Sequence, residues 1–130
     1  MPEVDRLVLE KFVPFRERVA DAFQSKHPRI FTMINAVLAG QLNKVGLQVI
    51  EGGQVTGEYT FSLEGMRITR TDTGKLEAEL HHPFLGIIKP YVVIERSKLE
   101  KLIADEAAFI ADALPTVAKH LPDLTVKFMR

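Results

Sequence analysis

The apolar residues of this chain change their spacing at Val45, and this change constrains the fold more than any other feature. Before Val45 they recur every three or four residues, as on one face of an α-helix. After it they alternate with polar residues, as in a β-strand with one buried face. The alternating positions are Val45, Leu47, Val49, Val55, Tyr59, Phe61, Leu63, Met66, Ile68, Leu76, Ala78 and Leu80. Glycine-containing turns separate the runs, so the pattern predicts an antiparallel meander of four strands.

The positions of the turns predict the register of three hairpins. The loops are expected at 52–54, 64–65 and 72–74, where glycines occur. The expected partners are Leu47 with Tyr59, Val45 with Phe61, Leu63 with Met66, Phe61 with Ile68, Ile68 with Ala78, Met66 with Leu80, Thr69 with Glu77, and Arg67 with Glu79. Such a sheet has one apolar face, which other elements must cover.

Two N-terminal helices are available to cover that face. The first is expected over 4–25, with an interruption at Pro14 and with the charged residues Arg16, Glu17, Arg18 and Asp21 turned to solvent. The second begins at Pro28 after a break at His27. Its apolar stripe consists of Ile30, Phe31, Ile34, Val37, Leu38 and Leu42.

The C-terminal third predicts a bend, a strand, a helix and a final strand. The apolar segment Pro83–Ile88 is bracketed by prolines and is expected to pack inward as a loop. A short strand is expected at 91–95, and a helix follows to about Leu114, capped by a box of Ser97 and Glu100. The alternation of Leu124, Val126 and Phe128 predicts a strand that pairs with the sheet. The expected fold class is therefore α+β: two N-terminal helices packed on a mainly antiparallel meander sheet, then a capped helix and a C-terminal strand. Residues 1–130 are expected to form a single domain.

Composition excludes several classes of function. Seventeen Lys and Arg balance seventeen Asp and Glu, which argues against nucleic acid and against a polybasic membrane-binding patch. The absence of cysteine excludes disulfides, thiolate metal sites and cysteine nucleophiles. No targeting segment and no apolar run of membrane-spanning length is visible, so we expect a cytoplasmic protein that is not an integral membrane protein.

Few residues suggest catalysis or metal binding. His81 and His82 are adjacent in an expected strand, so they point to opposite faces and would not chelate one ion together. Glu77 and Glu79 fit a solvated charge ladder, and no phosphate loop, dinucleotide-binding fingerprint or nucleophile elbow is present. We expect no cofactor and no metal, and an enzyme that uses His81 or His82 is the least favoured interpretation.

Eight phenylalanines are spread over nearly every expected element. They either fill a solid core or, with the sheet, the helices and the segment 83–88, enclose an apolar ligand cavity. A core and a cavity share one residue pattern, so the sequence leaves both open. The candidate lining residues are Phe31, Ile34, Leu38, Tyr59, Phe61, Phe84, Ile88 and Phe109.

Three stretches resemble the sterol-carrier-protein-2-like family of lipid-binding domains. Residues 45–53 (VGLQVIEGG) are similar to its first strand and glycine turn, 58–65 (EYTFSLEG) to its second strand, and 91–103 (YVVIERSKLEKLI) to the strand and helix after the meander. The order of elements over about 45–129 follows the family, although the expected hairpin at 66–82 is longer. The chain also lacks the family's Gly-Lys-Leu pattern before the last strand.

The resemblance implies non-enzymatic binding or carriage of a lipid or acyl chain in a cavity between sheet and helices. A hydrophobic small molecule is then the expected partner. The alternative is a homo-oligomeric interaction module, most simply a homodimer that forms through a sheet edge or through the segment 83–88.

Overall fold

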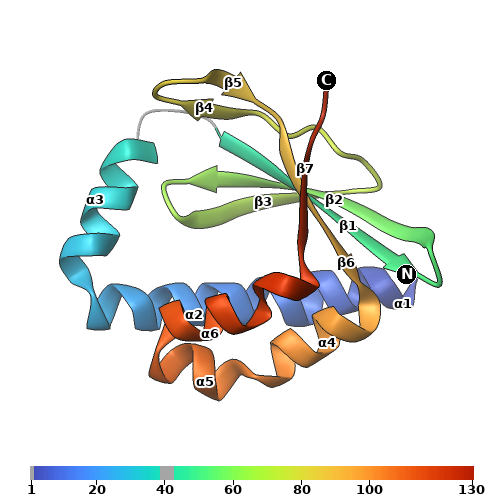
Figure 1. Ribbon diagram of the computed structural model, residues 1–130, viewed down its shortest axis with the longest axis horizontal. Coiled ribbons are helices and arrows are strands. Elements are labelled where there is room, and N and C mark those ends of the chain that lie inside the picture. Colours follow the sequence, from blue (N-terminus) through green and yellow to red (C-terminus); the bar gives the residue numbers. More distant parts are fainter. Residues whose placement is uncertain (1, 39–42) are drawn as a thin grey trace.

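The computed structural model describes residues 2–38 and 43–130, and the fold is α+β, as the sequence predicts. A layer of helices covers one face of a five-stranded sheet (Figure 1). The strand order is β3-β2-β1-β6-β7, and all neighbours are antiparallel except β1 and β6, which run parallel. The strands are β1 (Asn43–Glu51), β2 (Gln54–Glu64), β3 (Arg67–Thr73), β6 (Pro90–Glu95) and β7 (Thr125–Phe128).

The N-terminal helix is one irregular run beneath the sheet. It consists of α1 (Glu3–Arg6), η1 (Leu7–Phe12) and α2 (Val13–Lys26). The η1 turn is π-helical, and it ends where the amide of Val13 donates to the carbonyl of Val8. Pro14 follows at once and has no amide to donate, so the wide turn accommodates it without ending the helix. The expected interruption at Pro14 is therefore a change of helical register.

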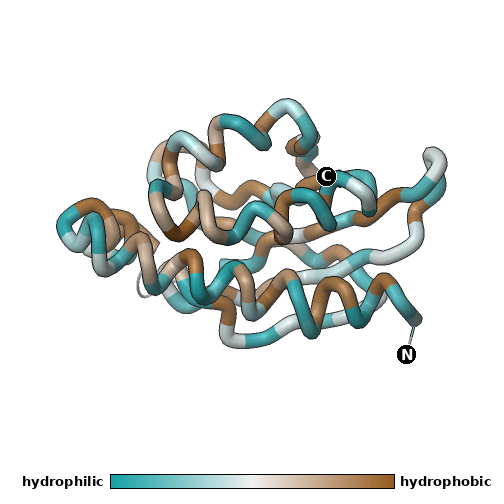
Figure 2. Tube along the Cα trace, turned by 90° about the horizontal axis from the view of Figure 1, so that it is seen from below, coloured by the Kyte–Doolittle hydropathy of each residue, from teal (hydrophilic) through white to brown (hydrophobic). Residues whose placement is uncertain are grey.

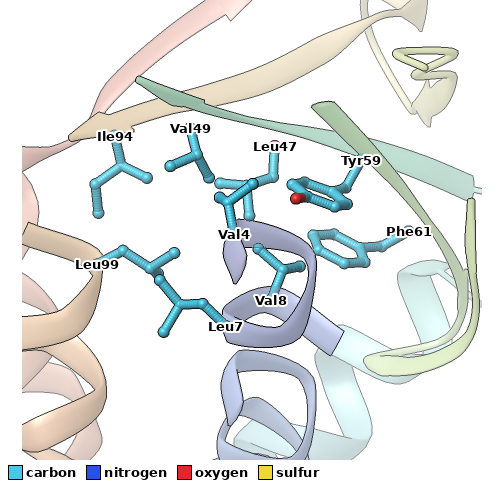
Figure 3. Close-up of a cluster of buried hydrophobic side chains, with 9 residues drawn as sticks. All are labelled: Val4, Leu7, Val8, Leu47, Val49, Tyr59, Phe61, Ile94 and Leu99. Atoms are coloured by element: carbon cyan, nitrogen blue, oxygen red, sulfur yellow. The ribbon is translucent and has the colours of Figure 1, made fainter. Parts of the chain in front are cut away.

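The hydrophobic core lies between this run and the sheet (Figure 3). Val4 of α1 and Val8 of η1 point up towards Leu47, Tyr59 and Phe61 of the first two strands, and Leu7 lies beside Leu99 (Figure 3). The other members of the cluster are Val49 and Ile94. The alternating pattern after Val45 thus places its apolar side chains on the helical side of the sheet.

The first turn is Gly52-Gly53, one residue shorter than the expected loop at 52–54, and a β-bulge at Val49/Ile50 restores the shift. The first hairpin therefore has the predicted partners, with Val45 opposite Phe61 and Leu47 opposite Tyr59. The second does not: the turn is Gly65-Met66, and Leu63, not Phe61, lies opposite Ile68. A β-bulge between Ser62 and Leu63 adds the extra shift. The predicted partners of the second hairpin are therefore wrong, because neither the bulge nor the turn position is encoded in the alternation.

The third predicted hairpin is absent from the described part of the chain. Arg67 pairs with Glu17 and Asp21 of α2 instead of Glu79, and β3 is an edge strand. The chain beyond Gly74 crosses the outer face of the sheet, where Thr60 Oγ1 donates to the carbonyl of Lys75 and accepts from the amide of Glu77. The predicted pairs of Ile68 with Ala78, Met66 with Leu80 and Thr69 with Glu77 are therefore wrong as well.

That crossing segment leads into a separate hairpin of β4 (Leu80–His82) and β5 (Gly86–Ile88). Its tip does not pack inward, as the sequence suggested, because Phe84, Leu85 and Ile87 are exposed. The hairpin lies on the side of the sheet away from the N-terminal helical run (Figure 1), so its tip does not enter the core between that run and the sheet.

The second helix, α3 (Pro28–Leu38), also departs from expectation. Seen from below, the N-terminal and C-terminal helical runs lie side by side, and α3 projects at one end (Figure 2). It packs on α2 and on the β2–β3 turn, and most of its apolar stripe is exposed. The expected stripe residue Leu42 lies outside the described residues.

The C-terminal elements follow the predicted order. After β6 come α4 (Arg96–Ala104), α5 (Glu106–Ala111), α6 (Ala113–His120) and the 3-10 turn η2 (Leu121–Asp123), and β7 pairs with β6. The predicted capping box is wrong, because α4 begins at Arg96 and Ser97 lies inside its first turn without a cap hydrogen bond. Glu100 instead pairs with Arg96 at 3.2 Å. The helix also breaks at Asp105 and Asp112, before Pro115.

Candidate functional site

Two apolar pockets lie between the helices and the sheet. The first has a volume of about 260 Å³ and lies against β1, β2 and β6. Its lining comes from the sheet and from the helices below it: Phe12, Arg16, Val45, Gly46, Leu47, Phe61, Leu63, Ile68, Pro90, Tyr91, Val92, Ile94, Leu99, Leu102 and Leu124.

The second pocket has a volume of about 390 Å³ and lies among the helices. Both volumes are near the range of known small-molecule sites, roughly 300–1,000 Å³. Its lining comes mainly from α2, α3 and the C-terminal helices: Phe12, Phe15, Arg16, Val19, Ala20, Phe23, Ile30, Ile34, Met66, Leu102, Phe109, Ala113, Leu114, Val117, His120 and Leu124.

The two pockets share four lining residues: Phe12, Arg16, Leu102 and Leu124. They therefore adjoin along one wall. Of all the lining side chains, only those of Arg16, Tyr91 and His120 carry a nitrogen or oxygen atom. A ligand in this space would meet hydrocarbon almost everywhere and a cation at the junction.

Arg16 is the charged group at that junction. Its side chain is only 28% exposed, and its guanidinium donates to the carbonyl of Met66. The nearest carboxylate, that of Glu17, is 3.9 Å away at the edge of ion-pair distance. Burial lowers the pKa of Arg16 from its ordinary value, with a smaller opposing effect from Glu17. Arginine stays protonated in proteins, so this is a cation with incomplete partners beside apolar space.

The larger pocket opens between α3 and α6. Four of its lining residues are themselves substantially exposed: Ile30, Ile34, Leu114 and Val117. Residues that line a pocket and also face solvent mark its rim. The mouth is therefore an apolar opening with one edge on each of these two helices.

His120, the last residue of α6, also lines the larger pocket. Its ring stacks on Phe109 with centroids 5.4 Å apart, and its Nε2 donates to Asp105 Oδ2 at 2.8 Å. Lys119 also contacts this carboxylate at 3.1 Å. The hydrogen bond from His120 and then that from Lys119 hold the pKa of Asp105 below its ordinary value. The bond orients the imidazole, so its apolar face completes the pocket.

Tyr59 is fully buried above the helical run, but it lines neither pocket. Its hydroxyl donates to Asp5 Oδ1 at 2.5 Å, which ties β2 to α1. Burial, and then the hydrogen bond to Asp5, raise the pKa of Tyr59 above its ordinary value. Tyr59 is therefore a core residue whose hydroxyl links two elements by a hydrogen bond.

The other residues that the sequence nominated for the site lie in three places. Phe61 lines the first pocket, and Ile34 and Phe109 line the second. Phe31 is buried on α3 against Phe23, and Leu38 is half-buried at the end of that helix. Phe84 and Ile88 belong to the β4–β5 hairpin, and neither borders the two apolar pockets.

Sequence reasoning missed Arg16, which it assigned to a solvated face. Arg16 follows Phe12 by four residues and precedes Val19 and Ala20 by three and four, so it lies on the apolar face of the helix. That spacing was the available signal. His120 gave no such signal, because its partner Asp105 lies between α4 and α5 and is brought close by the break at Asp112.

The histidine pair singled out in the sequence has a structural use. His82 Nδ1 accepts hydrogen bonds from the amides of Phe84 and Leu85, and so caps the hairpin tip. Across residues 2–38 and 43–130, no group of three histidine or acidic side chains is arranged to hold a metal ion. In that same part of the chain, no helix has the length and apolar character needed to cross a bilayer.

Comparison with known proteins gives little beyond this geometry. No family model matches the chain, and no curated protein matches it. Among solved structures, it is similar to the crystal structure of sterol carrier protein 2 like 2 from Aedes aegypti, at 14% identity and a TM-score of 0.37. The match covers 84% of this chain and 87% of the other. That structure carries the family name of the sequence resemblance, but a TM-score this low establishes neither membership nor a shared ligand.

Proposed function

We propose that this protein binds a small hydrophobic ligand with an acidic head, such as a fatty acid or another acyl chain, without chemical change to it. One observation carries the proposal: two adjoining apolar pockets share a wall in which Arg16 is the charged side chain. An apolar chain would fill the pockets, and a carboxylate or phosphate would pair with the guanidinium.

Burial of the chain supplies the driving force. Each methylene transferred from water contributes about 0.8 kcal/mol, so ten contribute about 8 kcal/mol before the entropic costs of association. The acidic head would otherwise lose hydration on entry. A charge-assisted hydrogen bond to Arg16 replaces that hydration and fixes which end of the ligand lies at the junction.

Binding without catalysis fits the lining. Arg16, Tyr91 and His120 are its polar side chains, and the Nε2 of His120 is already held by Asp105. No serine, threonine, lysine or carboxylate lines either pocket. The lining therefore supports a binding or carrier protein, not an enzyme that uses His81 or His82.

A ligand panel on delipidated protein tests the proposal. Protein refolded from denaturant is incubated with octanoic, lauric or palmitic acid, and complexes are detected by native mass spectrometry and by a rise in Tm. We expect one bound acid per chain. Absence of any complex and any Tm rise across the panel contradicts the proposal.

A blocking variant locates the ligand. Ala113→Trp fills the larger pocket, which Ala113 lines, whereas Ala118→Trp adds the same ring to an exposed site on the same helix. We expect Ala113→Trp to abolish complex formation and Ala118→Trp to preserve it. Equal binding by the two variants would place the ligand elsewhere.

A further inference from the structure

The helix α3 is amphipathic, yet it leaves most of its apolar side chains exposed. It contacts the protein through Asn35, whose Oδ1 accepts from the amide of Met66 at 2.9 Å. Phe31 is its buried residue, with the Arg67 guanidinium 5.5 Å from the ring centre. The apolar side faces outward, and Met33 is 69% and Val37 61% exposed. A surface helix normally buries such a stripe, so this side lacks the partner that its composition calls for.

The tip of the β4–β5 hairpin is a second exposed apolar group. Phe84 is 90% exposed and Leu85 70%, and Ile87 is also exposed. The His82 ring accepts from the amides of Phe84 and Leu85, and Gly86 has a positive φ of 74° that the turn needs. The tip is therefore held in one shape by its own hydrogen bonds while its apolar side chains project into solvent.

The two groups form one surface. Val37 of α3 and Ile87 of the hairpin line the same shallow depression, together with His81 and Pro83. At the other end of the stripe, Ile30 and Ile34 form the rim of the larger pocket. The apolar surface thus extends from the pocket mouth along α3 to the hairpin tip.

The segments that form this surface contain cations and no acid, although Glu64 at the end of β2 lines a hollow beside α3 with Thr32 and Asn35. The sequence has no Asp or Glu from 22 to 50 and none from 80 to 94, although it holds seventeen in all. The same segments contain Lys26, Arg29, Lys44 and Lys89 as well as His27, His81 and His82. Zero net charge of the chain therefore hides an uneven distribution of charge along it.

The excess of cations in these segments favours one class of partner. A second copy docked by the same surface would bring like charges together, because a two-fold interface opposes each patch with itself. An anionic lipid surface instead attracts lysine and arginine and takes up exposed apolar side chains at the depth of its headgroups. The observations therefore favour a membrane surface over a homodimer.

We propose that α3 and the β4–β5 hairpin dock on an anionic lipid bilayer, with Met33, Val37, Phe84 and Leu85 entering the interface. The pocket mouth then faces the lipid, which gives an acyl chain an apolar path between membrane and pocket. The route for the ligand rests on the proposed function. The docking itself does not depend on it, and the two are tested by separate measurements.

Vesicle co-sedimentation tests the docking. The probes are vesicles of phosphatidylcholine alone and vesicles of phosphatidylcholine and phosphatidylglycerol in equal amounts. We expect binding to the mixed vesicles, weakened by added salt, and little binding to the neutral ones. Phe84→Asp and Met33→Asp place an acid on exposed positions and should each lower the affinity by about tenfold or more. Val55→Asp is the matched control, since Val55 is 53% exposed on β2, outside this surface, and should bind as the wild type does.

Three outcomes overturn the docking: no binding to either vesicle, equal binding to both, or equal loss in Val55→Asp. The docking is also overturned if the protein binds no vesicles and light scattering shows a dimer that Phe84→Asp dissociates. The partner of this surface would then be a second copy of the chain. Fatty-acid binding in solution is measured on the same variants. If Phe84→Asp loses vesicles but keeps lauric acid, both proposals stand. If the wild type binds vesicles and no acid, docking stands and the proposed function fails.

Discussion

The role assigned to Arg16 is tested by Arg16→Met. This substitution removes the cation at the junction of the two pockets and keeps an unbranched side chain in its place. Arg18→Met is the control, because Arg18 is on the same helix but pairs with Glu106 outside both pockets. The two variants lose the same formal charge, so a difference between them reports on the location of Arg16.

The expected size of the effect follows from the contacts. A hydrogen bond to a charged group contributes about 1.5–3 kcal/mol, which corresponds to about 10- to 150-fold in affinity. The affinity of Arg16→Met for lauric acid should fall by that factor, and its affinity for methyl laurate, which has no charge, should change little. The free energy of unfolding should change by less than about 1 kcal/mol, because the lost bond to the Met66 carbonyl is offset by removal of a half-buried charge.

Isothermal titration of the wild type and both variants with lauric acid and methyl laurate separates the contribution of the Arg16 charge from that of its packing. Of the six combinations of protein and ligand, we expect only the binding of lauric acid by Arg16→Met to be weakened. Equal weakening of the acid and the ester would show that Arg16 contributes packing alone. Unchanged binding of both would remove Arg16 from the site.

Two further predictions concern stability. Tyr59→Phe leaves the Asp5 carboxylate without its 2.5 Å donor, so the free energy of unfolding in urea should fall by about 0.5–1.5 kcal/mol; no change would mean that water replaces the bond. Asp105→Asn should lower Tm most above the ordinary carboxyl pKa of 3.8. The lowered pKa of Asp105 in the folded state means that its contribution is present above that value and is lost as pH falls through the folded pKa. A Tm difference from wild type that is constant between pH ~7 and ~2 would rule out the pairing of Asp105 with His120 and Lys119.

Much of the fold could be predicted because its local signals agree. The change of period at Val45 placed the first strand, and the turn signal after it predicted Leu47 opposite Tyr59, a pairing that the structure reaches through a shorter turn and a β-bulge. The later hairpins could not be predicted. The alternation of Leu76, Ala78 and Leu80 looks the same whether the segment pairs in the meander or crosses the outer face of the sheet. Thr60, whose hydroxyl holds that crossing segment, lies outside it in the sequence.

The residues of the candidate site could likewise be predicted only in part. Phe61 and Phe109 could be nominated from hydrophobic pattern, but the same pattern nominated Phe84, which is exposed. Burial depends on what packs against a residue, and the hairpin tip has nothing opposite it. The reverse error occurred at Arg16, because a charged residue on an apolar helical face is easily assigned to solvent.

The sequence by itself determined the class of each main element, the α+β fold and the face of the sheet that is apolar, because period and turn chemistry are local properties. The tertiary structure alone decided where apolar pockets adjoin the hydrophobic core. It also decided that α3 turns its apolar stripe outward and that Arg16 faces the pockets. These depend on distances between elements far apart in the chain, such as α2, α6 and β6, and hydrophobic pattern does not encode those distances.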